Sequence, residues 1–342
     1  MKKPKILITG SSGFIGKQLV KKLYKKNNLF LLDKKKFSKK KTKFFKINLL
    51  NEISLEDFFK KNKIDIIIHL ASEIFDDDKN VYHYNTKTSQ NLITMAQKYK
   101  INNFIFTSTF SIYEKNYDLP IKENQEPSAK NFYGKSKYQV EKILKKSKIK
   151  NFTILRIPVV VGKARSHRMG ILFELIRNNF PLILINNGKH KIHFISVEEL
   201  VEIIEKCLKL KNKNLLNVGT KYTNTFRENI EYLVEKSKSN SRIININYYL
   251  GSLLLNILIF LKLVDINFYH KALLTQNMVL NTNKSDKKLK LKSEKSSKEI
   301  LLESYNYYIK NLRKISNIKS GSDKKPKLKI FNLLRLFSFV FK

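Results

Sequence analysis

The chain has 342 residues, with 68 Lys and Arg against 28 Asp and Glu, and a formal net charge of +40. Such an excess is typical of proteins that bind nucleic acids or anionic membranes. The 42% of hydrophobic residues can bury a large core, which excludes a disordered polyelectrolyte. Sixty of the basic residues are Lys, whereas base reading and bidentate phosphate binding favour Arg. We therefore attribute the charge to a general preference for Lys and expect no nucleic-acid partner.

Cysteine content and apolar segments indicate a cytoplasmic location. The single cysteine, Cys207, cannot form an internal disulfide, which fits a reducing compartment. Glycines interrupt the first apolar run before it reaches the length of a signal-peptide core. The later apolar stretch 250–264 is shorter than the ~20 residues that span a bilayer.

Short apolar runs alternate with helical patterns through the first half of the chain. We expect strands at 5–8, 30–32, 44–47, 64–69, 104–107 and 152–156, and helices at 14–26, 56–61, 86–100 and 133–146. The strands are almost continuously apolar, which is typical of parallel strands covered on both faces. The pattern predicts an α/β fold with a doubly wound parallel sheet.

The pattern changes after residue 165. We predict a dinucleotide-binding domain at 1–165, with segments near 192–220 returning to the sheet, at 193–195 and 215–218. Residues 166–191 and 221–310 are expected to form a smaller, mostly helical substrate-binding lobe. Residues 311–342 are predicted to be a basic, amphipathic C-terminal tail that contacts a membrane or a partner such as a glycosyltransferase, or packs on its own domain.

The segment TGSSGFIG, residues 9–16, follows the first strand and opens the first helix. In that position Gly10 permits a tight turn, Gly13 lets backbone approach a pyrophosphate, and Gly16 allows close packing of the helix. Asp33 ends the second strand, where a carboxylate can bind a ribose 2′-hydroxyl. That acid favours NAD, while the following lysines leave NADP open as an alternative.

Tyr133 and Lys137 are four residues apart in a predicted helix and so share one face. A neighbouring ammonium favours the phenolate, which brings a tyrosine into range for proton transfer near neutral pH. His69 ends a buried strand and is expected to be structural. His167, His190 and His193 lack metal-ligand spacing with carboxylates, so no metal site is predicted.

Together these motifs resemble the NAD-dependent epimerase/dehydratase family of extended short-chain dehydrogenase/reductases. The resembling segments are the glycine loop, Asp33, HLAS at 69–72, TSTFSIY at 107–113, YGKSK at 133–137 and the strand from Leu155 to Gly162. The resemblance implies a Rossmann-like fold, a homodimer and a cofactor site. The implied cofactor-binding residues are Gly10, Ser12, Gly13, Phe14, Ile15, Gly16, Asp33, Asn48, Leu49, Leu70, Ala71, Ser72, Asn85, Tyr133 and Lys137.

The resemblance also implies catalytic roles. Tyr133 would be the acid/base, and Lys137 would bind the nicotinamide ribose and lower the tyrosine pKa. Thr109 would hydrogen-bond the reacting oxygen, with Ser108 as a second candidate. Arg165, Arg168 and Lys191 are candidates for binding the substrate diphosphate.

Departures from the family pattern narrow the reaction. Sugar 4,6-dehydratases place Asp-Glu after the catalytic Thr, whereas Phe110 and Ser111 follow here, which argues against dehydration. We expect an epimerase that transiently oxidises a carbinol of a nucleotide sugar. The alternatives are an NAD(P)-dependent reductase of a keto-sugar or another small carbonyl, and a noncatalytic dinucleotide-binding protein.

Overall fold

The computed structural model describes residues 3–37, 39, 41–74, 78–115, 117–162, 167–261, 276–292 and 295–312. For His167, Arg168, Leu258 and Ile259 it describes only the backbone. The predicted C-terminal tail lies outside the described residues, apart from its first two positions.

The chain divides into two compact units. The first comprises residues 1–158, 197–219 and 280–293, and the second comprises residues 159–196, 220–279 and 294–342. Residues 280–293 belong to the first unit although the segments on either side of them belong to the second. The sequence pattern did not indicate this. The assignment of the units as cofactor and substrate domains stays a prediction.

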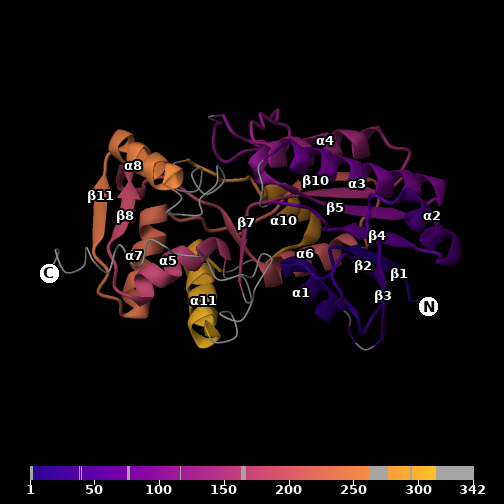
Figure 1. Ribbon diagram of the computed structural model, residues 1–342, viewed down its shortest axis with the longest axis horizontal. Helices are drawn as coiled ribbons and strands as arrows, with labels where there is room; N and C mark the ends of the chain where they lie inside the picture. Colours follow the sequence, from indigo (N-terminus) through magenta and orange to yellow (C-terminus); the bar gives the residue numbers. More distant parts are fainter. Residues whose placement is uncertain are drawn as a thin grey trace. The chain divides into compact units, whose positions relative to one another are not determined.

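A seven-stranded parallel sheet forms the centre of the first unit (Figure 1). Its order is β10-β6-β5-β4-β1-β2-β3. The strands are β1 (Lys5–Thr9), β2 (Asn28–Asp33), β3 (Thr42–Lys46), β4 (Ile66–His69), β5 (Asn103–Thr109), β6 (Phe152–Ile157) and β10 (Lys213–Asn217). All four residues of β4 are buried, as expected for a strand covered on both faces. The predicted doubly wound α/β fold is confirmed.

Helices cover both faces of this sheet. One layer holds α2 (Glu52–Lys61), α3 (Lys79–Lys98) and α4 (Phe132–Lys146), and the other holds α1 (Phe14–Leu23) and α6 (Val197–Cys207) (Figure 1). The short α10 (Asn283–Leu289) lies against α6 and β10. Apolar residues of α2, α3 and α4 pack with the strands in one continuous core. Because the carboxyl ends of parallel strands share one edge of the sheet, their connecting loops meet there.

One part of the predicted sheet was wrong. The segment 215–218 does return to it, since β10 pairs with β6 through Leu215 and Ile154. The segment 193–195 does not, because β9 (Phe194–Ser196) pairs with β7 (Val159–Val161) in a separate two-stranded sheet. Pro158 stands between β6 and β7, where its missing N–H ends the ladder and lets the chain leave the sheet.

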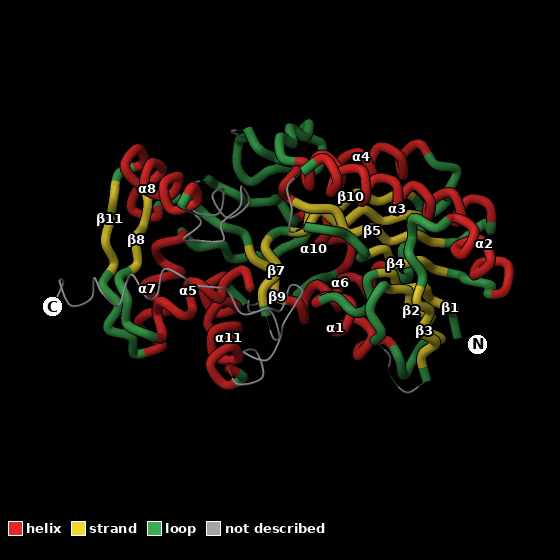
Figure 2. The backbone as a smooth tube through the Cα atoms, in the orientation of Figure 1, coloured by secondary structure: helices red, strands yellow, loops and turns green. Residues whose placement is uncertain are grey.

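The second unit is built from helices around two small sheets. Besides β7 and β9 it contains β8 (Leu182–Ile185), β11 (Ile243–Ile246), α5 (His167–Arg177), α7 (Phe226–Ser237), α8 (Tyr248–Phe260) and α11 (Ser297–Lys310) (Figure 2). Phe173 of α5 packs against the rings of Tyr305 and Tyr308, each at a centroid distance of 5.5 Å. The Tyr308 hydroxyl donates to buried Glu174 at 2.7 Å, which satisfies the polar end of that cluster.

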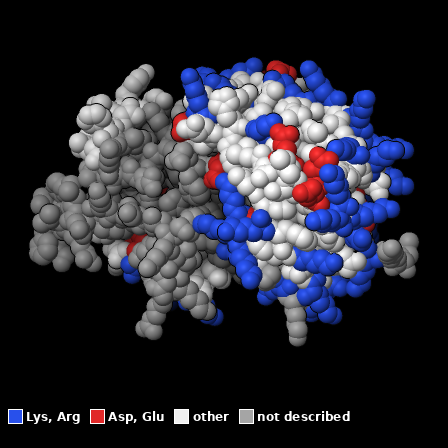
Figure 3. Space-filling view, turned by 45° about the vertical axis from the view of Figure 1, so that its right-hand side comes forward, with Lys and Arg blue, Asp and Glu red and all other residues white. Residues whose placement is uncertain are grey.

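The positive charge is spread over the surface of the first unit. On the face shown in Figure 3, Lys and Arg side chains surround the unit and acidic side chains are few. This distribution fits a chain-wide preference for Lys. Among the residues described, no helix combines the length and apolar character needed to cross a membrane.

Candidate active site

The glycine loop between β1 and α1 is held in a tight turn. Gly10 has φ of +70°, and a Cβ there would lie 2.7 Å from the Ala71 nitrogen. A Cβ on Gly16 would lie 2.2 Å from the Gly10 carbonyl oxygen. Both positions therefore require glycine. Gly13 is the N-cap of α1 and has no side chain to cap it, so the first turn of α1 can face a phosphate.

Other residues of the loop support this turn. Ser12 donates its backbone N–H to Asp33 Oδ2 at 2.9 Å, and the N–H of Lys35 donates to Oδ1 at 3.1 Å. The carboxylate at the end of β2 thus lies directly against the loop. Phe14 is buried at the start of α1, and Ile15 is partly exposed beside it.

His69 joins three elements behind the loop. Its Nδ1 lies 2.7 Å from Thr9 Oγ1 on β1, and its Nε2 lies 2.9 Å from Ser89 Oγ on α3. Burial lowers the pKa of His69 to about 3, with a smaller contribution from the Lys137 charge. The ring is therefore neutral at physiological pH and connects β1, β4 and α3, which agrees with the structural role expected for it.

The segment after β4 is fixed by Asn85 of α3. Its amide donates to the Glu73 carbonyl at 2.9 Å and accepts from the Glu73 N–H at 2.8 Å. Leu70, Ala71 and Ser72 lie between this clamp and β4 and are half-buried. Asn85 also donates to Ser136 Oγ of α4 at 3.2 Å, so one side chain links the two helices.

Asn48 and Leu49 follow β3. Asn48 is exposed, and its side-chain oxygen accepts from the Leu50 N–H at 3.2 Å. Leu49 is buried, and Asn91 of α3 donates to its carbonyl at 3.0 Å. Both residues therefore follow a strand at the carboxyl edge of the sheet.

The start of α4 is held against the end of β5. Asn131 caps the helix by accepting from the Gly134 N–H at 2.6 Å, and its amide donates to the Ser111 carbonyl at 3.4 Å. A Cβ on Gly134 would lie only 2.2 Å from that carbonyl oxygen. The close approach places Tyr133 beside the turn that follows β5.

Lys137 lies one turn further along the same face of α4. Its Nζ donates to the Thr107 carbonyl of β5 at 3.0 Å and lies 5.8 Å from the Tyr133 ring centroid. Burial lowers the pKa of Lys137 to about 7, because the ammonium is removed from water. A lysine whose charge changes near neutral pH beside a tyrosine is suited to assist proton transfer.

Thr109 and Ser108 have different surroundings at the end of β5. Thr109 Oγ1 lies 3.2 Å from both the nitrogen and the Oγ of Ser111, at the turn that faces α4. Ser108 is buried, and its hydroxyl donates to Glu141 Oε1 at 2.6 Å. The Ser108 hydroxyl is thus part of a buried polar cluster, while Thr109 lies at the turn beside the start of α4.

The partner of Ser108 is a buried ion pair that the sequence analysis missed. Arg156 of β6 donates to both oxygens of Glu141, from Nε at 3.0 Å and from Nη2 at 2.7 Å. Arg156 also donates to the Tyr113 hydroxyl. Two features of the sequence could have indicated this ion pair. One is the arginine inside an apolar strand, and the other is the position of Glu141 on the helical face shared by Tyr133 and Lys137. This pair fixes α4 to the sheet at the candidate site.

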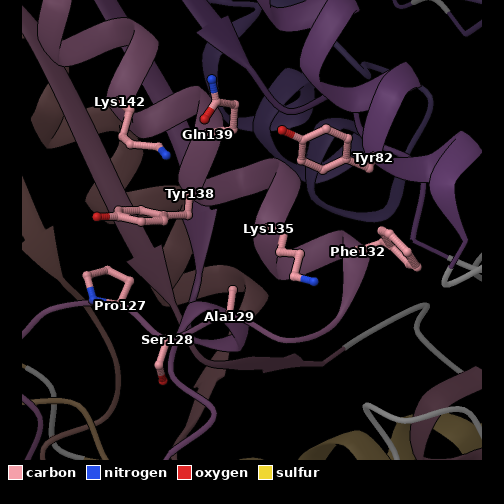
Figure 4. Close-up of a pocket in the computed structure, with 9 residues that line it drawn as sticks. All are labelled: Tyr82, Pro127, Ser128, Ala129, Phe132, Lys135, Tyr138, Gln139 and Lys142. Carbon is pink, nitrogen blue, oxygen red and sulfur yellow. The ribbon is translucent and has the colours of Figure 1, made fainter.

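The opposite face of α4 lines a cavity of about 350 Å³. Phe132, Lys135, Tyr138, Gln139 and Lys142 of α4 surround it, together with Tyr82 of α3 and residues 127–129 (Figure 4). The Tyr138 hydroxyl donates to Glu126 at 2.6 Å. Tyr133 and Lys137 do not line this cavity, so α4 separates it from the candidate catalytic face.

The predicted diphosphate-binding residues belong to the second unit. Arg165 lies outside the described residues, and the side chain of Arg168 is likewise not described. Lys191 is exposed, and its backbone N–H donates to Asn277 Oδ1 at 2.8 Å. Their predicted role stays a prediction. Within the described ranges, no three His, Cys, Asp or Glu side chains form a group that could hold a metal ion.

A comparison with known protein families shows to which family the chain belongs. Residues 6–219, which are more than half of the chain, match the NAD dependent epimerase/dehydratase family. The chain belongs to this family. The epimerase/dehydratase match begins in β1 and ends just after β10, so it includes the glycine loop, Asp33, Thr109, Tyr133 and Lys137. The protein is therefore an enzyme of the epimerase and oxidoreductase type.

Individual relatives within the epimerase/dehydratase family are distant. A dTDP-D-glucose 4,6-dehydratase of Dictyostelium discoideum is 30% identical over 260 residues, which are 64% of this chain and 58% of the relative. A UDP-glucose 4-epimerase of Caenorhabditis elegans is 31% identical over 201 residues, or 49% and 57% of the two chains. The chain thus spans just over half the length of these two relatives.

A solved structure supports the same fold. The UDP-glucose 4-epimerase of Thermotoga maritima, determined with UDP-glucose, superposes with a TM-score of 0.74 at 21% identity. The match covers 90% of this chain and 99% of that one. The predicted Rossmann-like architecture of an epimerase/dehydratase is confirmed.

Proposed function

We propose that the protein is an NAD-dependent nucleotide-sugar epimerase that oxidises a sugar carbinol and reduces it again from the other face. The observation that carries this proposal is the buried face of α4, where Lys137 donates to the Thr107 carbonyl at 3.0 Å beside the Tyr133 ring. Family membership supports the reaction type, and the distant relatives named for nucleotide sugars support the substrate class.

The cofactor fits the glycine loop. Gly10 and Gly16 leave no room for a Cβ, and Gly13 opens α1 without a capping side chain, which is the shape needed at a pyrophosphate. Asp33 holds the loop through the Ser12 N–H, and its carboxylate disfavours a 2′-phosphate, which supports NAD over NADP. When bound, NAD supplies the acceptor and then the donor of the hydride.

Residues of this chain accept and return the proton of the sugar hydroxyl. The Tyr133 phenol oxygen takes the proton of the sugar hydroxyl as the carbinol is oxidised and returns it when the keto group is reduced. Lys137 in its charged form stabilises the phenolate. Thr109, at the turn beside the start of α4, hydrogen-bonds the reacting oxygen. No external oxidant is consumed, because each hydride removed is returned.

The test is a panel of UDP-, dTDP- and GDP-sugars incubated with the purified protein without cofactor, with NAD, and with NADH or NADPH. An epimerase forms the stereoisomer, seen by NMR, without net absorbance change at 340 nm. Stoichiometric consumption of NADH or NADPH would instead establish the reductase alternative. Cofactor binding without turnover of any sugar in the panel would contradict the proposed substrate class. Tyr133→Phe is the matched control for contaminating activity.

A further inference from the structure

Helix α8 in the second unit is apolar and exposed. Its 13 residues, YYLGSLLLNILIF, contain no charged side chain. Tyr249 is 85% exposed and Phe260 84% exposed, and Leu250, Leu253 and Ile257 are also exposed. Isolated apolar residues are normal on a protein surface, but a continuous apolar helix in water indicates a binding surface.

Two of the described residues of α8, Gly251 and Leu255, are buried. A Cβ on Gly251 would lie 2.7 Å from Ile185 Cγ1 and 3.0 Å from Ile246 Cδ1, so the helix rests directly on the ends of β8 and β11. Leu255, one turn later, is buried as well. Figure 2 shows α8 beside this strand pair. Among the described side chains of α8, those of Tyr249, Leu250, Leu253 and Ile257 are exposed.

The same face of the sheet extends the apolar surface. Ile244 of β11 is the register partner of Ile183 of β8, and both are exposed. They precede Ile246 and Ile185 by two residues and so share the face on which α8 lies. With α8 and Leu261 they contribute ten of the fourteen large apolar side chains that are exposed in the described part of the chain.

A basic side chain stands at the edge of this surface. Arg242 precedes Ile244 by two residues, so it lies on the same face, and it is exposed. Lys238 is exposed four residues earlier. An apolar face with a basic edge complements an anionic lipid surface. A second copy of this chain is disfavoured as the occupant, because each copy carries a net charge of +40.

We infer that the exposed face of α8, with Ile183 and Ile244, docks the protein on the surface of an anionic phospholipid bilayer. The helix has 13 residues and is about 20 Å long at 1.5 Å per residue, too short to span a hydrocarbon core of about 30 Å. It therefore lies in the interface plane. Tyr248 and Tyr249 at one end fit that position, because tyrosine is enriched at the level of lipid headgroups.

The experiment uses the absence of tryptophan from the chain. A full-length Tyr249→Trp protein carries a single indole on α8, and Tyr222→Trp carries one on an exposed position outside the surface. Vesicles of phosphatidylcholine with phosphatidylglycerol are expected to shift the emission of the first protein to the blue and leave the second unchanged. Vesicles of phosphatidylcholine alone are expected to bind more weakly.

Charge substitutions then locate the surface by vesicle flotation. Leu253→Glu with Ile257→Glu is expected to weaken binding by about a hundredfold, since two apolar side chains leave the lipid. Arg242→Gln is expected to weaken binding only to anionic vesicles, by about fivefold. The matched control is Ile53→Glu on α2, because Ile53 is 78% exposed and lies in the other unit.

Three results would overturn the inference. The first is an unshifted Tyr249→Trp emission with anionic vesicles. The second is a blue shift without vesicles that grows with protein concentration, which would assign the surface to a second copy. The third is undiminished flotation of the double Glu variant, which would place lipid binding elsewhere in the chain. Sugar turnover in solution is measured in parallel and is expected to be unchanged, so this test is independent of the proposed reaction.

Discussion

The ammonium nitrogen of Lys137 donates to the Thr107 carbonyl oxygen at 3.0 Å, and this bond survives loss of the lysine proton because a neutral amine also donates. The charge on Lys137 can therefore change without moving the side chain. Since burial lowers its pKa to about 7, the native protein holds a costly buried charge at acidic pH.

Lys137→Met is expected to reduce turnover and to raise stability below pH 7. There the lysine is charged in both the folded and unfolded states, so the wild type bears the full cost of burying it. Between pH 7 and 10.5 only the unfolded chain keeps the proton, so wild-type stability rises and the advantage of Met shrinks. Urea unfolding of both proteins at pH 6 and pH 9 measures the difference. An equal difference at both pH values would contradict the lowered pKa.

Tyr133→Phe is expected to lower kcat by about 10²–10⁴-fold, because the proton of the sugar hydroxyl loses its acceptor. NAD affinity should change little, since the glycine loop is untouched. Isothermal titration with NAD and the nucleotide-sugar assay give the two readouts. Wild-type turnover in the variant would remove Tyr133 from the mechanism.

Gly16→Ala and Gly13→Ala form a matched pair at the cofactor loop. The new Cβ at position 16 would lie 2.2 Å from the Gly10 oxygen, whereas the one at position 13 would lie 3.2 Å from it. A helical Gly→Ala change in open space stabilises by about 1 kcal/mol. We expect Gly16→Ala to lose NAD affinity by about tenfold or more and Gly13→Ala to lose less. The reverse order of the two dissociation constants would show that the loop adjusts.

Removing one partner of the Glu141–Arg156 pair is expected to destabilise the protein by about 3–5 kcal/mol, because the other charge stays buried. Arg156→Met and Glu141→Leu test this singly, and the double variant should recover much of the loss. Ser108→Ala is the mild control, since it removes one hydrogen bond to Glu141. Additive losses in a urea-unfolding cycle would argue against the coupling.

Two buried histidines should make the protein sensitive to acid. Burial lowers the pKa of His69 to about 3 and that of His193 to about 4. Below pH 6.5 these histidines take up protons in the unfolded chain but not in the folded protein. Stability therefore falls as the pH is lowered, until each native pKa is reached. Each ring contributes a slope of up to about 1.4 kcal/mol per pH unit. His69→Asn should flatten the dependence between pH 6.5 and 4, and an unchanged slope would count against it.

The parts of the site that the sequence predicted are local in the chain. The glycine loop is a strand, a turn and a helix in succession, and Tyr133 and Lys137 share a face through helical spacing alone. The pairing of β7 with β9 was missed because it joins residues 159–161 to 194–196. No local pattern encodes that contact, and the apolar run at 193–195 fits either sheet.

The contact of Ser108 was likewise missed because it joins residues that are distant in the sequence. The position of Ser108 beside Thr109 made this serine a catalytic candidate, which stays a prediction, and its hydroxyl donates to Glu141, 33 residues away. The acid and its arginine come from a helix and a strand with different periodicities. Only the packing of α4 on β6 brings the three side chains together.

The ion pair between α4 and β6 has a consequence for protein engineering. Glu141 and Arg156 each destabilise the fold when their partner is replaced, because a buried charge is then left unpaired. Helix α4, which carries the acid/base candidate, and strand β6 must therefore be exchanged together. A chimera that grafts residues 131–157 together keeps the charge balance of its donor. A chimera that grafts α4 alone leaves a buried carboxylate or arginine without its partner beneath the candidate catalytic face.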